Sequence, residues 1–199
     1  MRESGVGRVL VASLHQAIGE ILPTRLGFYE NWLTPEGLRD GTIGLPPLYA
    51  VLSFLRQEGP AYADVARTAG AYAAEWTVAS MSPFGRSFIS RLPRLVRRRV
   101  VLGRAAELVH MSYDGSRATS RTRKGVARMT VKASVFCSVR EPVPHPLCGF
   151  YAAMCERMLT LFDIETSVTV ESCRGAGGDA CVLRVPFTPE QDAAPAETS

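Results

Sequence analysis

Apolar residues in the first half of the chain recur with the spacing of an α-helix. In the segment 6–22, for example, Val9, Ala12, Ile18 and Ile21 fall near helical spacing. Proline and glycine residues interrupt this pattern at intervals, and each interruption is typical of a helix end. The pattern predicts helices over residues 6–22, 26–33, 48–57, 61–79, 86–92 and 94–111, with a loop at 34–42. The first half is therefore expected to be almost entirely helical.

The pattern changes to a period of two in the second half. Small or apolar residues alternate with polar ones from Ala127 to Val139, which predicts one long, half-buried strand. Cys137 lies on the apolar face of that strand, so we interpret it as a core residue and not as a ligand. A helix is predicted over 148–162, followed by a closing hairpin of 167–173 and 181–187. Helices followed by an antiparallel sheet with a helix across it predict the α+β class.

Composition fits one compact domain over residues 1–187. The chain has 199 residues, and 46% of them are hydrophobic. Residues 188–199 are rich in Ala, Pro, Glu and Asp and are expected to be disordered. The odd number of cysteines, five, and the lack of a signal peptide favour a reducing cytoplasm. No segment reaches the roughly 20 apolar residues of a membrane span.

The basic residues are concentrated in two blocks, although the net charge is only +4. They are Arg86, Arg91, Arg94, Arg97, Arg98, Arg99 and Arg104 in the first block, and Arg117, Arg121, Arg123, Lys124 and Arg128 in the second. No recognition-helix or aromatic stacking motif accompanies them, so we expect no nucleic-acid partner. Two interpretations stay open. The blocks are solvated faces, or they attract a ligand carboxylate or an acidic partner protein.

Residues with metal-binding chemistry gather in the C-terminal third. The segment from Cys173 to Cys181 contains three glycines that allow the chain to reverse, so its two thiols can approach each other. Cys148 begins the predicted helix, and Glu171 precedes Cys173 by two positions on the predicted strand, which puts both on one face. Thiolates and a carboxylate suit zinc. The predicted ligands are Cys148, Glu171, Cys173 and Cys181.

Other interpretations of these cysteines stay open. Paired Cys-x-x-Cys knuckles are absent, and on spacing alone buried thiols that pack as small hydrophobes are the more frequent case. Cys155 follows Cys148 by seven residues, which puts both on one helix face. Cys155 either replaces a ligand or simply packs. A three-thiol site completed by water is a further alternative.

The order of these motifs resembles the C-terminal half of the 4-vinyl reductase domain family. The motifs are Pro-x-Cys, an apolar helix, a β-rich segment with a glutamate, and Cys-Arg-Gly-x-Gly-x-x-x-Cys leading into a last strand. That family includes a bacteriochlorophyll-biosynthesis protein once regarded as the vinyl reductase, the sensor domains of phenol-responsive transcription activators, and relatives of TRAPP vesicle-tethering subunits. The segment 92–116, which contains His110 and the sequence Tyr-Asp-Gly-Ser, is most similar to the bacteriochlorophyll branch.

The resemblance implies a zinc site. Sensor domains hold zinc by three cysteines and a glutamate, and the cysteines match Cys148, Cys173 and Cys181. The family places its glutamate three residues before the second cysteine, where this chain has Val170. Glu171 therefore fits only with a small local shift.

The resemblance also implies a function. It predicts a module that binds a hydrophobic small molecule, such as a tetrapyrrole, and serves an enzyme of bacteriochlorophyll or porphyrin metabolism. Basic side chains near the acidic groups of the ligand are then expected at Arg94, Arg98, Arg99 and His110. The alternatives are a vinyl reductase, for which no dinucleotide motif is found, and a zinc-containing sensor of aromatic ligands. We also expect a homodimer formed through small-residue faces of the early helices, such as Ala69, Ala73 and Ala74.

Overall fold

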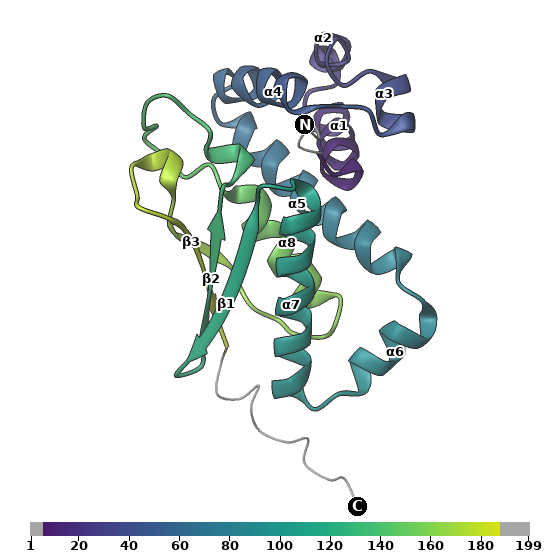
Figure 1. Cartoon of the computed structure of the whole chain (residues 1–199), viewed down its shortest axis with the longest axis vertical. Helices are drawn as coiled ribbons and strands as arrows, with labels where there is room; N and C mark the ends of the chain where they lie inside the picture. Colours follow the sequence, from purple (N-terminus) through teal and green to yellow (C-terminus); the bar gives the residue numbers. More distant parts are fainter. Residues whose placement is uncertain (1–5, 188–199) are drawn as a thin grey trace, which may run out of the picture.

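The computed structural model describes residues 6–187. The predicted disordered segment 188–199 lies outside this range. The fold is α+β, as predicted, with helices and an antiparallel sheet on opposite sides of the molecule (Figure 1). The helices are α1 (Arg8–Ile21), α2 (Leu26–Tyr29), α3 (Pro35–Asp40), α4 (Leu45–Gln57), α5 (Ala61–Ser80), α6 (Pro83–Arg91), α7 (Arg94–Ser112) and α8 (Gly149–Thr160). The strands are β1 (Arg117–Arg123), β2 (Val126–Lys132), β3 (Thr169–Ser172) and β4 (Cys181–Pro186), and the 3₁₀ turns are η1 (Pro23–Arg25), η2 (Val135–Cys137) and η3 (Arg174–Ala176).

Helix α5 lies at the centre of the helical layer and packs against α1 and α8. Ala69, Ala73 and Ala74 on α5 are fully buried inside the chain. The prediction that this face mediates a dimer is therefore wrong, because the face is already covered by other helices of the same chain. Homodimerisation itself stays a prediction.

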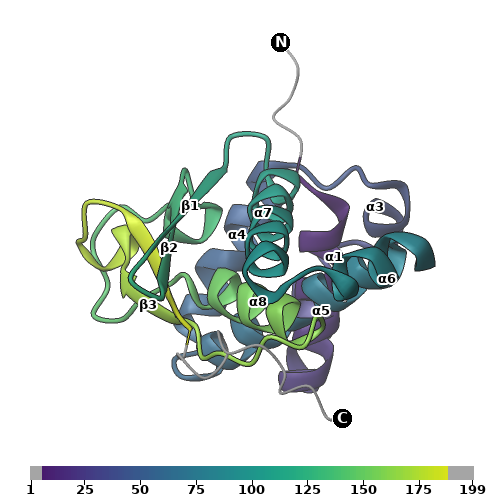
Figure 2. The same ribbon diagram turned by 90° about the horizontal axis from the view of Figure 1, so that it is seen from below.

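The sheet has the order β1-β2-β4-β3, with every neighbouring pair antiparallel. One face of β2 is buried at Ala127, Met129 and Val131, and these residues alternate with exposed or half-buried ones, as expected for a sheet covered on one side. Helices α7 and α8 lie beside the sheet, with α1 and α5 on the far side of them (Figure 2).

The predicted long strand is wrong in its second half. β2 ends at Lys132, and Ala133 takes a left-handed backbone angle, φ 51°, that turns the chain out of the sheet. The following 3₁₀ turn η2 ends at Cys137. Two consecutive residues with positive φ, Lys124 and Gly125, close the hairpin between β1 and β2.

Helix α3 was not predicted, because its sequence has the proline and glycine of a loop. Pro35 occupies the first turn, where its missing N–H costs nothing, and the Thr34 hydroxyl accepts a hydrogen bond from the Gly37 N–H at 3.1 Å. This cap allows a short helix to form.

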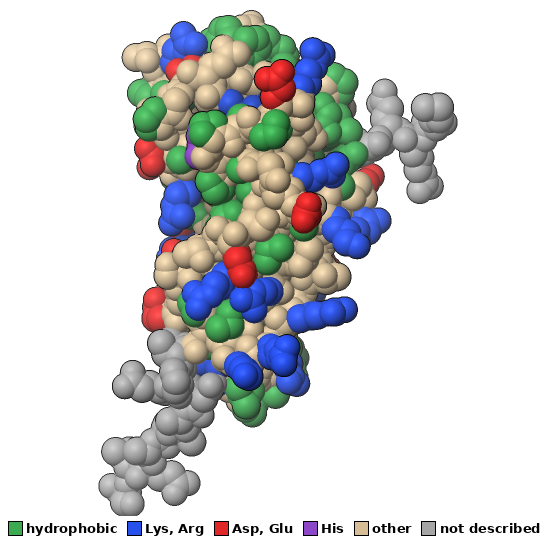
Figure 3. All heavy atoms as spheres, turned by 90° about the vertical axis from the view of Figure 1, so that its left-hand side faces the viewer, with side chains coloured by type: hydrophobic (Ala, Val, Ile, Leu, Met, Phe, Trp, Pro, Cys, Tyr) green, Lys and Arg blue, Asp and Glu red, His purple; other side chains and the backbone are tan. Residues whose placement is uncertain are grey.

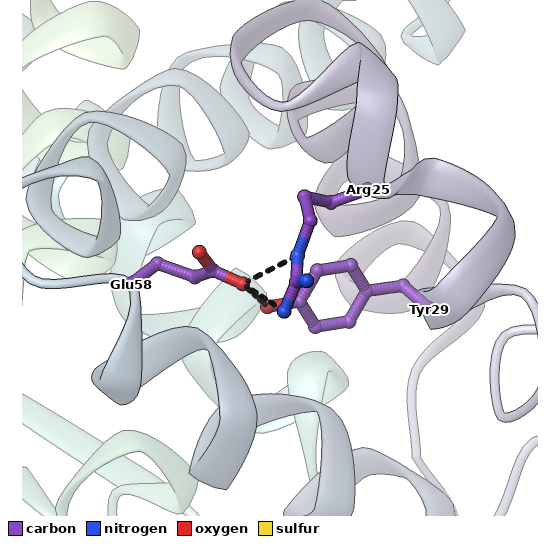
Figure 4. A network of polar contacts seen from close by, with 3 residues as sticks. All are labelled: Arg25, Tyr29 and Glu58. Atoms are coloured by element: carbon purple, nitrogen blue, oxygen red, sulfur yellow. Dashed lines mark hydrogen bonds and ion pairs between the residues drawn. The ribbon is translucent and has the colours of Figure 1, made fainter.

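A polar network anchors the C-terminal end of α4. One carboxylate oxygen of Glu58 accepts hydrogen bonds from the Tyr29 hydroxyl at 3.0 Å and from Nε of Arg25 at 3.1 Å (Figure 4). Burial and the nearby carboxylate raise the pKa of Tyr29, so the phenol remains a neutral donor. The network fixes the last turn of α4, which carries Arg56.

Among residues 6–187, no helix is both long enough and apolar enough to cross a membrane.

Candidate metal centre

Four buried thiols converge at one end of the sheet. Their Sγ atoms lie within 4.8 Å of one another, and the residues are Cys137, Cys148, Cys173 and Cys181, here called the cysteine cluster. Sγ of Cys137 lies 3.1 Å from that of Cys148 and 3.4 Å from those of Cys173 and Cys181. All four are free thiols, and none is more than 8% exposed. The cluster therefore has the composition and the proximity needed to hold a metal ion.

Each thiol is contributed by a different segment. Cys137 ends η2, Cys148 caps the N-terminus of α8, Cys173 follows β3, and Cys181 begins β4. The aromatic rings of Phe136 in η2 and Phe150 in α8 stack with centroids 4.9 Å apart. An ion at the cluster would thus link two turns, a helix start and a strand start.

Glycines allow the loop between Cys173 and Cys181 to close onto its neighbours. Gly177 takes a left-handed angle, φ 87°, and ends the η3 turn. A Cβ on Gly175 would lie 2.8 Å from the side chain of Leu147, so a larger residue there would push the loop away from Cys148. The N–H of Val143 donates to the Gly175 carbonyl at 2.9 Å and ties the proline-rich segment to this loop.

The sulfur positions suit a tetrahedral metal. Zinc bonds thiolate at about 2.3 Å, which places the sulfurs of an ideal tetrahedron about 3.8 Å apart. The closest pairs in the cluster are separated by 3.1 to 3.6 Å, so an ion requires only a small expansion. A set of four thiolates selects zinc or iron over magnesium or calcium, which prefer oxygen ligands.

The pKa values of the cluster thiols are shifted in opposite directions. Hydrogen bonds from Cys137 and the other cluster thiols, together with the Leu147 N–H at 3.3 Å, lower the pKa of Cys173. Hydrogen bonds with Cys137 and Cys173, together with burial, raise the pKa values of Cys148 and Cys181. Ion binding therefore displaces protons from these thiols.

Arg56 on α4 provides positive charge beside the cluster. Burial lowers the pKa of its guanidinium, while Tyr62 and Cys137 act to raise it. Its Nη1 is buried and has no hydrogen-bond partner within residues 6–187. A divalent ion with four thiolates leaves a net negative charge, which the guanidinium would partly offset.

We expect Arg56→Met to weaken zinc binding by about tenfold. This is the lower end of the loss of metal affinity that follows when a group outside the coordination shell is removed. Methionine keeps much of the side-chain volume and removes the charge. Competition with a chromophoric chelator measures the affinity, and Arg39→Met, on the exposed end of α3, is the matched control. Equal affinities in the two variants would show that Arg56 does not act on the cluster.

Glu171 is not brought into the cluster. Its carboxylate forms a two-pronged ion pair with Arg128, at 2.7 Å and 3.1 Å, and this pairing lowers the pKa of Glu171. The strand register shifts between Val170 and Ser172, so Glu171 is the extra residue of a β-bulge. Burial alternates along β3 as far as Ser172, where the strand ends, so the alternation does not extend to Cys173. Glu171 consequently faces solvent while Cys173 is buried, and the prediction that they share a face is wrong.

Cys137 is the cluster residue that the sequence pattern missed. It is buried, as predicted, but it lies among the cluster thiols and not on a strand. A signal was present, because Cys137 precedes Cys148 by only eleven residues. Cys155 is outside the cluster; it is fully buried on α8, and burial raises its pKa to about 12, as for a packed thiol.

The predicted ligand-binding arginines do not converge on one site. Arg94 and Arg98 line a small cavity of about 140 Å³ together with Asp163 and Glu165. Arg98 is buried, with its guanidinium 4.4 Å from the centre of the Phe187 ring. Arg99 and His110 do not line this cavity, and Nδ1 of His110 contacts Arg117 and the Ser116 carbonyl oxygen.

A hollow of about 390 Å³ opens beside the cluster, and Cys137 is the cluster thiol that lines it. Tyr49, Arg140 and Arg174 form part of its wall.

We expect iodoacetamide to alkylate Cys137 first once a chelator has removed metal, because a hydrogen bond from Cys148 lowers the pKa of Cys137 and a path to solvent exists. Peptide mass mapping over time checks this order. Earlier labelling of Cys148, Cys173 or Cys181 would contradict it.

No protein-family model and no curated protein sequence matches this chain. The resemblance to 4-vinyl reductase domains stays a prediction, and the metal centre is argued from its geometry.

Proposed function

We propose that this chain is a small-molecule-binding module stabilised by one zinc ion at the cysteine cluster. The observation that carries the proposal is the convergence of four buried, unbridged thiols within 4.8 Å. Four cysteines are a standard ligand set for structural zinc. The protein supplies all four ligands, so the ion would have no open position for a substrate. Its role would be to hold the fold.

Zinc would stabilise the region that joins α8 to the sheet. With free zinc at about 1,000 times the dissociation constant, binding to the folded state alone contributes about 4 kcal/mol to the free energy of unfolding. For a chain of this size, that corresponds to about 10 °C in the midpoint of thermal unfolding.

Metal removal and reconstitution test this role. Anaerobically purified protein is treated with a strong chelator, melted, and melted again after addition of zinc or magnesium. We expect the midpoint to fall by about 10 °C and to recover with zinc alone. An unchanged midpoint after verified zinc removal would reject the stabilising role. Visible thiolate-to-iron absorption in the purified protein would instead identify the ion as iron.

For the ligand, we propose a tetrapyrrole or a comparably large planar hydrophobe. The candidate place for it is a groove of about 290 Å³ between α5, α6, α7 and α8, which would hold only part of so large a ligand. Met81 and Met111 contribute apolar surface, and Arg104 lies at the edge, where it pairs with Glu107. The role in bacteriochlorophyll or porphyrin metabolism, as carrier or accessory protein, rests on the resemblance of the segment 92–116. Vinyl reduction is the alternative.

Porphyrin titration followed by fluorescence tests the ligand. We expect a dissociation constant below about 100 micromolar, equivalent to roughly 5 kcal/mol. Arg104→Gln should weaken binding, because a guanidinium pairs well with a propionate. Arg99→Gln, on the same helix but outside the groove, is the matched control. The absence of binding would reject a tetrapyrrole, and a larger effect of Arg99→Gln would move the site to the arginine-rich end of α7.

A further inference from the structure

Large apolar side chains are exposed along α6 and the first turn of α7. Phe84 is 82% exposed, Phe88 59%, Leu95 61% and Val96 44%. These four residues are here called the α6–α7 patch. Figure 1 shows α6 on the side of the molecule away from the sheet, joined to the lower end of α7 by a short connection. Phe84 and Phe88 are one helical turn apart and so lie on the same face of α6.

Helix α6 is only lightly packed on the rest of the chain. Among its nine residues, Ile89 alone is buried. The Ser82 hydroxyl accepts a hydrogen bond from the Gly85 N–H at 3.1 Å, so the helix has a defined start even though little of it is covered. The helix therefore keeps its shape while it presents its two phenylalanine rings to solvent.

The segment that carries the patch has only positive charges in its sequence, although the fold brings Asp163 and Glu165 beside Arg94 and Arg98. No Asp or Glu occurs from Trp76 to Ala106, a stretch that contains seven arginines. Arg91 follows Phe88 by three residues and Arg99 follows Leu95 by four, so each exposed cation is a neighbour of an exposed apolar side chain on its own helix. Within residues 6–187, neither Arg91 nor Arg99 forms an ion pair, whereas Arg97 and Arg104 pair with Asp163 and Glu107.

The sheet surface differs from the patch although it is also basic. Figure 3 shows lysine and arginine side chains gathered on the side of the molecule formed by the sheet, with carboxylates between them. Arg121 and Arg123 of β1 are exposed there, and Arg128 pairs with Glu171. None of the large exposed hydrophobic side chains of residues 6–187 lies on a strand. Within the described chain, the four most exposed of the large apolar side chains apart from Met111 are on α6 and the start of α7, next to exposed arginines; a smaller pairing of this kind is formed by Arg25 and Phe28.

We propose that the α6–α7 patch docks the protein onto an anionic lipid surface. The phenylalanine, leucine and valine side chains would enter the boundary between headgroups and acyl chains, while Arg91 and Arg99 pair with lipid phosphates. Charge complementarity favours an anionic lipid surface over a second copy of the chain as the partner of the patch. A second copy of the chain would bring one arginine-rich stretch against another, with no carboxylate from residues 76–106 to compensate.

Docking would also place the groove proposed for the tetrapyrrole at the lipid surface, because Ser82 and Gly85 at the start of α6 line that groove. This consequence rests on the proposed function. The lipid proposal itself does not, since it requires neither the metal nor the groove ligand.

Co-sedimentation with vesicles tests the proposal. Phosphatidylcholine vesicles are compared with vesicles that also contain phosphatidylglycerol, using the full chain at moderate salt. We expect at least about tenfold tighter binding to the anionic vesicles. The variant Phe84→Ser/Phe88→Ser and the variant Arg91→Gln/Arg99→Gln should each weaken this binding by about tenfold. All four positions are exposed, so unchanged circular dichroism and metal content are expected to confirm that the variants fold.

The matched control is Arg121→Gln/Arg123→Gln, which removes the same charge from the sheet surface and should leave binding unchanged. An equal loss in this control would overturn the proposal, because the attraction would then be non-specific. Equal binding to neutral and anionic vesicles, or no binding to either, would also overturn it. A concentration-dependent dimer in sedimentation velocity that Phe84→Ser/Phe88→Ser dissociates would assign the patch to a second copy instead.

Discussion

Replacing Cys137 with serine is expected to lower the zinc content from about one ion per chain to less than about a tenth. The Cys137 sulfur lies within 3.4 Å of the three other cluster sulfurs, so its loss removes one of four ligands. A serine hydroxyl is a much poorer zinc ligand than a thiolate, and the remaining buried thiolates would be left around an incomplete shell. Elemental analysis of freshly purified protein measures the effect, with Cys173→Ser as the positive comparison.

Two control variants test whether the loss of zinc is specific to the thiols of the cysteine cluster. Glu171→Gln removes the carboxylate that pairs with Arg128 on the surface, and Cys155→Ser removes a thiol outside the cluster. Both should keep zinc at about one ion per chain. Full zinc in Cys137→Ser together with loss in Glu171→Gln would restore the ligand set that the sequence predicted.

Replacing Gly70 with alanine is expected to destabilise the protein by about 3 kcal/mol, the upper part of the usual range for overpacking a core. A Cβ at this position would lie 2.2 Å from the Phe150 carbonyl oxygen and 3.0 Å from the Met154 nitrogen. Both are backbone atoms of α8, so no side-chain rotation relieves the clash. The two helices must separate, and α8 would then shift Cys148 at its N-terminus.

Thermal or urea unfolding measures this loss, and Gly103→Ala is the matched control. Gly103 lies in the middle of α7, and a Cβ there meets no atom within 4 Å. That substitution should stabilise the helix by up to about 1 kcal/mol, because alanine has the higher helix propensity. If Gly70→Ala were as well tolerated as Gly103→Ala, the close packing of α5 against α8 would be incorrect.

Most of the helical half was predictable because its apolar residues follow a helical period over long stretches. Helices α5 and α7 begin at the predicted residues, Ala61 and Arg94, and each ends one residue later than predicted. Short elements were less predictable. Helix α3 depends on a single side-chain cap, and a proline and a glycine within so few residues are also typical of a loop.

The metal centre was predicted in part, because its ligands depend on local breaks in regular structure. Cys148, Cys173 and Cys181 were identified from their spacing and from the glycine-rich loop. Cys137 was missed because Ala133 takes a positive φ that few alanines adopt, and the alternating sequence gave no sign of this turn. Glu171 was chosen on the assumption that the strand continues through Cys173, whereas β3 ends at Ser172.

X-ray absorption at the zinc edge of the purified, metal-loaded protein tests the central claim most directly. The account predicts about one zinc per chain, with a first shell of four sulfurs at about 2.3 Å and no lighter ligand. A first shell that contains an oxygen or nitrogen at about 2.0 Å, or protein without bound zinc, would contradict it.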